Sequence, residues 1–136
     1  MIALLDTLLP GGEGWPAAGA LGLATRMEVL VAAAPGGAEA LARVLDALPR
    51  DFAALAPESR EATLREVEAC HPAAFETVLS AAYAAYYTDG RVCDVIARRT
   101  GFPDRPPQPL GHPLPPFDMR ALEAVQARGA TWRRTD

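Results

Sequence analysis

Residues 72–87, PAAFETVLSAAYAAYY, give the clearest secondary-structure signal in the chain. Pro72 suits the first position of a helix, where its missing N–H group costs nothing. Apolar side chains then recur at the 3.6-residue helical period, and they are Phe75, Val78, Leu79, Ala82, Tyr83 and Tyr86. The pattern predicts a helix that buries Tyr83 and Tyr86. Tyr87 lies about 100° further round than Tyr86, where it either seals the core or faces a partner.

Similar apolar stripes recur on both sides of this helix, and no strand-like alternation does. They predict helices at residues 2–9, 17–34, 41–48, 57–70 and 91–100, and a short one after Asp118. Phe52 and Leu55 continue the third stripe beyond Pro49, so that helix either bends or ends there. We therefore expect an all-α fold, a compact bundle of about five or six helices.

A proline-rich stretch divides the chain of 136 residues. Seven of its 13 prolines lie between Pro103 and Pro116, where neither a helix nor a sheet ladder can form. We expect a helical core domain at residues 1–102. Residues 103–136 are then an extended strap with a short helix, packed either on this core or on a partner.

Charge and hydropathy exclude several classes of function. A net charge of −4 gives no basic surface for nucleic acid, and all 13 basic residues are arginine. No apolar stretch approaches the ~20 residues that would span a membrane. The N-terminus lacks the positive segment of a signal peptide, and the pairs Arg98–Arg99 and Arg133–Arg134 lie too far along the chain for a twin-arginine signal. These features predict a cytoplasmic protein.

The residue types of a catalytic or cofactor site are sparse. The two histidines, His71 and His112, lack the i,i+3 or i,i+4 partners of a helical metal site. The glycines at 11, 12 and 14 follow a helix, whereas a phosphate-binding loop follows a strand. We expect no catalytic residue, metal, flavin or nicotinamide in this chain.

Several aromatic and proline residues are candidates for binding a partner. Phe117 and Trp132 lie outside any long apolar stripe, so they either fold onto the chain's own core or anchor on a partner. The predicted partner-binding residues are Tyr87, Phe102, Pro106, Pro107, Phe117 and Trp132. The alternative is a freestanding small enzyme or ligand-binding protein with a pocket among Tyr83, Tyr86, Tyr87 and Trp132.

An ordered set of short segments covers residues 3–105. The segments are Leu5-Asp6-Thr7-Leu8-Leu9-Pro10, Trp15-Pro16-Ala17, Leu21-Gly22-Leu23, Phe52-Ala53-Ala54-Leu55, the helix from Pro72 to Tyr87, and Gly101-Phe102-Pro103. In this order they resemble the gluconate 2-dehydrogenase subunit 3 family. Its members are small subunits of flavin-dependent oxidoreductases of the glucose-methanol-choline (GMC) type.

The resemblance implies a non-catalytic accessory subunit. In that family the small subunit binds a large FAD-dependent subunit and supports its maturation, while the large subunit holds FAD and carries out the sugar or alcohol chemistry. Periplasmic members resemble proteins with a twin-arginine leader, and this sequence instead starts at its first helix. The resemblance thus implies either a cytoplasmic member or a periplasmic one whose leader has been removed.

Overall fold

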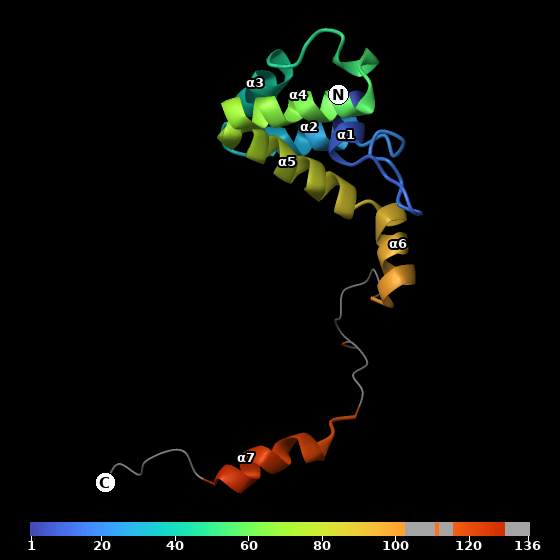
Figure 1. Cartoon of the computed structure of the whole chain (residues 1–136), viewed down its shortest axis with the longest axis vertical. Helices are drawn as coiled ribbons and strands as arrows, with labels where there is room; N and C mark the ends of the chain where they lie inside the picture. Colours follow the sequence, from blue (N-terminus) through green and yellow to red (C-terminus); the bar gives the residue numbers. More distant parts are fainter. Residues whose placement is uncertain (103–110, 112–115, 130–136) are drawn as a thin grey trace, which may run out of the picture. The chain divides into compact units, whose positions relative to one another are not determined.

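The computed structural model describes residues 1–102, 111 and 116–129 (Figure 1). The chain divides into two compact units, residues 1–104 and 105–136, which we describe separately. The described residues form helices and no strand, apart from one isolated bridge between Gly12 and Trp15. The predicted all-α class is therefore confirmed.

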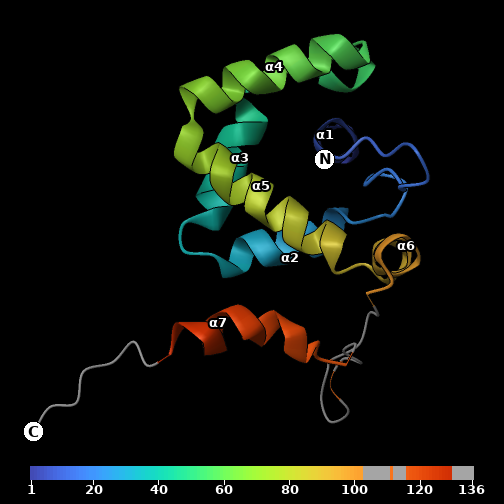
Figure 2. The same ribbon diagram turned by 60° about the horizontal axis from the view of Figure 1, so that its bottom comes forward.

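The described part of the first unit contains six α-helices and one 3-10 turn. They are α1 Ile2–Leu8, α2 Ala24–Ala33, α3 Gly37–Asp46, η1 Phe52–Ala54, α4 Pro57–Cys70, α5 Pro72–Tyr87 and α6 Gly90–Thr100. Helix α5 contacts each of α1, α2, α3, α4 and α6, and it is the central element of the unit (Figure 2). Because α5 packs against all five of these helices, the exposed side chains of its last turn extend from a backbone that is held in place.

One predicted helix boundary is wrong, and the alternative left open at Pro49 is decided. The helix expected at residues 17–34 begins only at Ala24, because the preceding residues form turns and Gly22 adopts a left-handed φ of +68°. Helix α3 ends at Asp46, and Phe52 packs into the core from η1. The third stripe therefore ends before Pro49 instead of bending through it, since proline supplies no N–H and restricts the residue before it.

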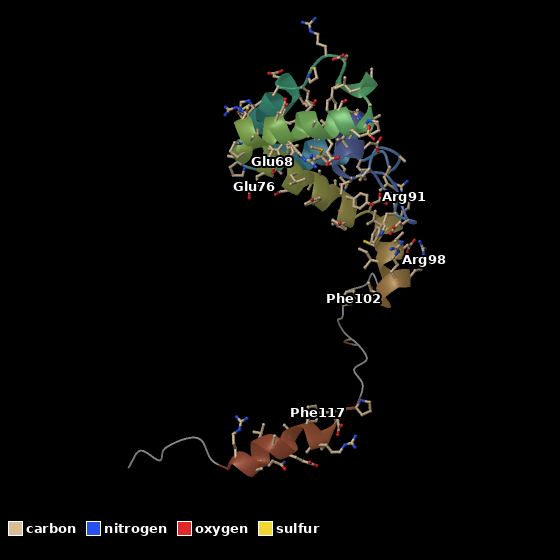
Figure 3. All side chains as sticks on the ribbon, in the orientation of Figure 1. Glu68, Glu76, Arg91, Arg98, Phe102 and Phe117 are labelled. Carbon is tan, nitrogen blue, oxygen red and sulfur yellow. The ribbon has the colours of Figure 1, made fainter. Side chains whose placement is uncertain are left out.

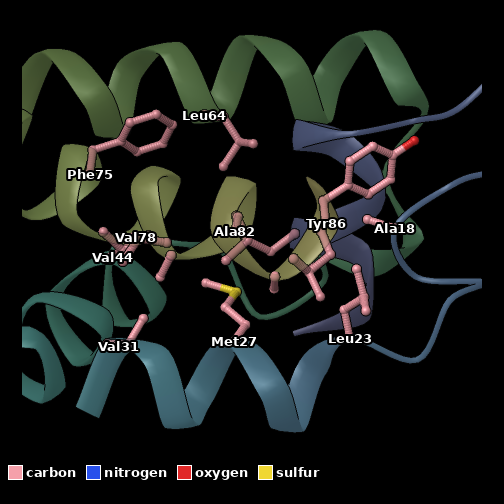
Figure 4. Close-up of a cluster of buried hydrophobic side chains, with 14 of the residues drawn as sticks. Ala18, Leu23, Met27, Val31, Val44, Leu64, Phe75, Val78, Ala82 and Tyr86 are labelled. Atoms are coloured by element: carbon pink, nitrogen blue, oxygen red, sulfur yellow. The ribbon is translucent and has the colours of Figure 1, made fainter. Parts of the chain in front are cut away.

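The core is built around the alanine-rich face of α5 (Figure 4). Ala82 and Ala85 are fully buried, and Val78 lies between them and Phe75. Met27 and Val31 of α2 pack into the same cluster from one side, with further contacts from α3 and α4. Small side chains on α5 permit this close approach of helices.

Tyr83 is exposed, which contradicts its predicted burial. Its exposed fraction is 43%, whereas Tyr86 retains only 3% and is buried as predicted. The buried face of α5 runs through Val78, Ala82 and Tyr86, and Tyr83 lies about 100° away from Ala82. Tyr83 instead lies on the same edge of α5 as Tyr87, which follows four residues later.

The described part of the second unit is one short helical segment. It comprises η2, Met119–Leu122, and α7, Glu123–Arg128. The Asp118 carboxylate accepts a hydrogen bond of 3.0 Å from the backbone N–H of Arg120, so Asp118 caps the segment. None of the helices in the described parts of either unit is both long and apolar enough to cross a bilayer.

Candidate functional site

A tight hairpin at Gly12–Trp15 presents Trp15 at the surface of the first unit. Two backbone hydrogen bonds of 3.0 and 2.9 Å join Gly12 and Trp15. The two central residues have positive φ angles, 51° at Glu13 and 88° at Gly14, as in a type I′ turn. Glycine suits this geometry, while a non-glycine residue with positive φ is uncommon. The turn therefore holds Glu13 in a strained conformation beside Trp15.

Three helices hold the segment that follows this hairpin. The Asp6 carboxylate of α1 accepts a hydrogen bond of 2.7 Å from the N–H of Gly19. The Tyr86 hydroxyl of α5 donates to the Pro16 carbonyl at 2.8 Å, and the Arg91 guanidinium of α6 donates to a further carbonyl, that of Leu21, at 2.8 Å. These bonds fix a segment that lacks regular secondary structure of its own.

Arg99 connects the C-terminal end of α6 to the hairpin. Its guanidinium carbon lies 5.3 Å from the centroid of the Trp15 ring, within the range of a cation–π interaction. The same guanidinium donates a hydrogen bond to the carbonyl oxygen of Glu13. Trp15 is therefore held by its own turn and by a cation on its ring.

The three tyrosines of α5 form a contiguous aromatic group. The ring of Tyr87 makes an edge contact with Tyr86 at a centroid distance of 5.2 Å and a tilted contact with Tyr83 at 6.1 Å. Burial raises the pKa of the Tyr86 hydroxyl, and the neighbouring Tyr87 raises it further. Tyr87 itself is 49% exposed, and its carbonyl accepts a hydrogen bond of 3.3 Å from the Cys93 thiol.

A hollow of about 260 Å³ lies between the end of α1, the hairpin and the end of α5. Its lining is apolar and aromatic, and consists of Leu8, Leu9, Pro10, Gly11, Gly12, Trp15, Tyr86 and Tyr87. Within the described residues, neither the Trp15 indole N–H nor the Tyr87 hydroxyl hydrogen bonds to the protein. Both polar groups are thus available to a bound molecule. We call this hollow the Trp15–Tyr87 pocket.

Helix α6 brings positive charge to this end of the unit. It carries three arginines, at 91, 98 and 99, against one aspartate, Asp94, in a chain whose net charge is −4. Figure 3 labels Arg91 and Arg98 on this helix. Asp89 caps the helix, and hydrogen bonds from the Arg91 side chain, with a further one from the Arg91 backbone N–H, hold the pKa of this carboxyl below its usual value. Gly101 ends the helix in the left-handed conformation, as its sequence position predicts.

Of the predicted partner-binding residues that the structure describes, only Tyr87 lines this pocket. Phe102 is 59% exposed but follows α6 while Tyr87 precedes it, so a helical rise of about 16 Å separates them. Phe117 is 65% exposed and belongs to the second unit. Pro106, Pro107 and Trp132 lie outside the described residues.

The ligand pocket predicted among the tyrosines is only partly found. Tyr86 and Tyr87 line the Trp15–Tyr87 pocket, whereas Tyr83 does not, and the predicted fourth member Trp132 lies outside the described residues. Trp15 was not predicted as a site residue. The available signal was its position directly after Gly11, Gly12 and Gly14, since glycines of this density mark a turn that can display an aromatic side chain.

A larger hollow of about 630 Å³ lies under α1, the end of α3 and η1, with Leu4, Leu45 and Phe52 in its wall and Asp46 and Arg50 as its charged residues. The residues that the structure describes contain no group of three or more histidine, cysteine, aspartate or glutamate side chains that is placed to hold a metal ion.

Comparisons of the chain with protein-family models, with curated proteins and with solved structures found no match in any of the three.

Proposed function

We propose that this chain is a non-catalytic small subunit of a flavin-dependent oxidoreductase of the GMC type. It binds the large FAD-containing subunit and stabilises or matures it. The proposal rests on the resemblance of its ordered segments to the gluconate 2-dehydrogenase subunit 3 family. The flavin and the sugar or alcohol chemistry then belong to the partner.

The observation that carries the proposal is the convergence of three of these segments on one pocket. Residues 72–87 are far in sequence from residues 5–10 and 15–17, and each of the three segments contributes side chains to the Trp15–Tyr87 pocket. A shared requirement to bind a partner would explain why these segments resemble the family together. Exposed tyrosine and tryptophan are also the side chains most enriched at the centres of protein interfaces.

The proposed surface comprises the Trp15–Tyr87 pocket and the neighbouring Tyr83. Tyr83 and Tyr87 are 43% and 49% exposed, and their rings contact each other, so a partner would bury both together. Because α5 packs on every helix of its unit, these rings are already positioned before a partner arrives. Such preorganisation lowers the entropy cost of association.

The test is co-expression with a candidate large flavoprotein from the same genome, followed by co-purification. We expect a complex that shows the visible absorbance of flavin, whereas the isolated small subunit is colourless. The double substitution Tyr83→Ala and Tyr87→Ala should weaken capture at least about tenfold, as expected for truncated interface anchors. Val29→Ala is the control, because Val29 is a 65% exposed apolar residue on a different helix, α2.

The contribution of residues 103–136 is tested separately. If the tail docks on the partner, Phe117→Ala and Trp132→Ala should each cost roughly 2 kcal/mol of partner affinity and leave the melting temperature of the isolated chain unchanged. If both variants leave capture unchanged and lower the melting temperature, the tail stabilises its own chain. The proposed function would then rest on the first unit alone.

The second candidate is a freestanding ligand-binding protein or small enzyme. The Trp15–Tyr87 pocket favours it, since the pocket has aromatic walls and two available polar groups. Its volume of about 260 Å³ is nevertheless below the roughly 300–1,000 Å³ that is usual for small-molecule sites. Turnover of a sugar or alcohol by the isolated chain, without a flavoprotein, would decide for this candidate.

A further inference from the structure

We propose that Asp6 is a positioning residue of the Trp15–Tyr87 pocket, because it holds residues 17–22 in a turn that otherwise joins α2. In the assembled state the turn is held and the pocket is complete. In the released state α2 extends through the turn and carries Trp15 away from Tyr87. This inference gives the site a means of regulation, and its consequence for partner capture rests on the proposed function.

Residues 17–22 have the composition and part of the geometry of a helix. Four of these six residues are alanine or leucine, which favour helix. The N–H of Leu21 donates to the Ala17 carbonyl at 3.3 Å, in the i to i−4 pattern of an α-helix. Leu23, which directly precedes α2, already has right-handed angles, φ −77° and ψ −2°. Gly22, with a φ of +68°, therefore separates the turn from α2.

Gly22 is free to adopt the alternative conformation. Glycine populates right-handed and left-handed angles about equally well, so its own preference does not select the turn. A Cβ atom placed on Gly22 would find no other atom within 4 Å, so close packing does not select it either. Contacts elsewhere in the turn must hold Gly22 left-handed. With Gly22 right-handed, residues 17–33 form one helix, close to the helix that the sequence predicts at 17–34.

Asp6 holds the middle of the turn. Its carboxylate accepts a hydrogen bond of 2.7 Å from the N–H of Gly19, in a partly buried position. Hydrogen bonds to a carboxylate are roughly twice as strong as those between neutral groups. A Cβ atom placed on Gly19 would overlap this carboxylate, so the two groups fit closely. Because α1 packs against α4 and α5, the bond ties the turn to the core of the unit.

The other two side-chain bonds act near the ends of the turn. The Tyr86 hydroxyl bonds to the Pro16 carbonyl, and Arg91, which also pairs with Asp89, bonds to the Leu21 carbonyl. Leu21 is itself buried, so the assembled state is favoured while all the contacts are present. Loss of the Asp6 carboxylate frees the middle of the turn and leaves the core side chains in place. The balance then shifts toward the released state.

The position of Trp15 depends on this turn. Trp15 precedes residues 17–22 by two positions, and it lines the pocket opposite side chains of α1 and α5. When the turn takes the direction of α2, the segment before it must move as well. Tyr87 then loses the indole that faces it across the hollow. The surface that a partner would bury is no longer continuous.

The first test follows Trp15 in the full chain without a partner. Trp132→Phe leaves Trp15 as the single tryptophan. In that background, Asp6→Ala should move the Cα chemical shifts of residues 17–22 toward helical values and make the fluorescence of Trp15 easier to quench with acrylamide. Asp6→Asn should keep both signals of the wild type, because its amide oxygen still accepts the bond from Gly19. Wild-type shifts and quenching in Asp6→Ala would overturn the proposal.

A second variant reaches the released state without touching Asp6. Gly22→Ala disfavours the left-handed angle by roughly fivefold or more, so it should produce the same helical shifts and the same exposure of Trp15. It also decides the question if Asp6→Ala does not fold, since unchanged shifts in Gly22→Ala overturn the proposal. Circular dichroism confirms that each variant keeps its helices.

Gly36→Ala is the matched control for Gly22→Ala. Gly36 lies beyond the other end of α2, has a φ of +67°, and likewise has no atom within 4 Å of an added Cβ. This variant should lower the melting temperature and leave Trp15 as in the wild type. If Gly22→Ala and Gly36→Ala increase quenching equally, the effect is a general loosening of the bundle and the proposal is overturned.

Capture of the flavoprotein separates this inference from the proposed function. Apparent affinity falls by the fraction of chain that remains assembled, so a variant that is about 90% released should lose roughly tenfold. If Asp6→Ala releases Trp15 and capture is unchanged, Asp6 positions the pocket and the partner docks elsewhere. If Asp6→Ala does not release Trp15 while the Tyr83 and Tyr87 substitutions still abolish capture, this inference fails and the proposed function stands.

Discussion

The hydroxyl of Tyr86 donates a hydrogen bond of 2.8 Å to the carbonyl oxygen of Pro16, 70 residues earlier in the chain. Tyr86 is the last buried residue of α5, and Pro16 directly follows the indole that lines the pocket. One bond thus joins the central helix of the bundle to the segment that carries Trp15. The stability of the core and the geometry of the pocket are connected through it.

Removing the hydroxyl should destabilise the protein without emptying the core. We expect Tyr86→Phe to lower the free energy of unfolding by about 1 kcal/mol, because the ring still fills its site while the Pro16 carbonyl loses its donor. Urea denaturation followed by circular dichroism measures this change. Tyr83→Phe serves as the control and should be neutral, since no hydrogen bond of the Tyr83 hydroxyl joins it to the described residues.

We expect Tyr86 to make the protein less stable at alkaline pH. Burial raises the pKa of Tyr86 above its ordinary value of 10.0, so the unfolded chain releases this proton before the native state does. The contribution of Tyr86 is therefore full below pH 10.0 and is lost as pH rises through the native pKa. Unfolding curves between neutral and alkaline pH should show a shallower decline for Tyr86→Phe than for the wild type.

Asp89 predicts the opposite dependence at acid pH. Its carboxylate accepts hydrogen bonds from the backbone and side chain of Arg91 at the start of α6, and this pairing lowers its pKa. The contribution is present above the ordinary value of 3.8 and is lost as pH falls through the native pKa. We expect Asp89→Ala to cost about 1 kcal/mol at neutral pH, and the difference from wild type to shrink in acid.

The matched substitution for Asp89 is Asp94→Ala on the same helix. Asp94 is exposed in the middle of α6 and has no hydrogen bond or ion pair within the described residues. It should change stability little at any pH. If Asp89→Ala and Asp94→Ala lower the free energy of unfolding by equal amounts, the effect comes from the net charge of α6, and the capping interaction contributes nothing specific.

Arg99 is expected to control the mobility of the hairpin. Its substitution by alanine removes both the cation over Trp15 and the donor to Glu13, while the core side chains of α6, such as Val92, are untouched. Backbone amides of Gly12 and Trp15 should then exchange with solvent faster, with global stability nearly unchanged. Amide exchange measured by NMR tests this, with Arg98→Ala as the neighbouring control. An unchanged exchange rate at Gly12 would show that the backbone hydrogen bonds of the turn keep it closed without Arg99.

Periodicity predicted the bundle better than it predicted the pocket. Helix α5 and its buried residues Phe75, Val78 and Tyr86 follow from the spacing of apolar side chains, because burial of one helical face is a local pattern. The expected helix at residues 17–34 was too long. Alanine and leucine favour helix, but residues 17–23 form turns, to which α6 adds a long-range hydrogen bond from Arg91 to the Leu21 carbonyl. Trp15 and Tyr87 line one pocket through long-range packing of this kind, which no local pattern encodes.

The sequence pattern also failed to predict which residues at the edge of α5 are exposed. Tyr83 has the spacing of a core residue, yet the small side chains of Ala82 and Ala85 already occupy the buried face. Aromatic residues satisfy a hydrophobic pattern whether they are covered or half covered. The spacing therefore identified the helix, while the choice between core and surface depended on how closely α2 and α3 approach it.

The alanine face of α5 makes the core respond unequally to changes in side-chain volume. Where Ala81, Ala82 and Ala85 lie against neighbouring helices, removing atoms costs little because few are present, whereas added methyl groups must displace a packed helix. Single-base changes of an alanine codon produce valine, threonine, proline, serine, aspartate, glutamate or glycine, and only glycine is smaller. Random mutation at these positions therefore pushes the bundle apart far more often than it leaves a cavity.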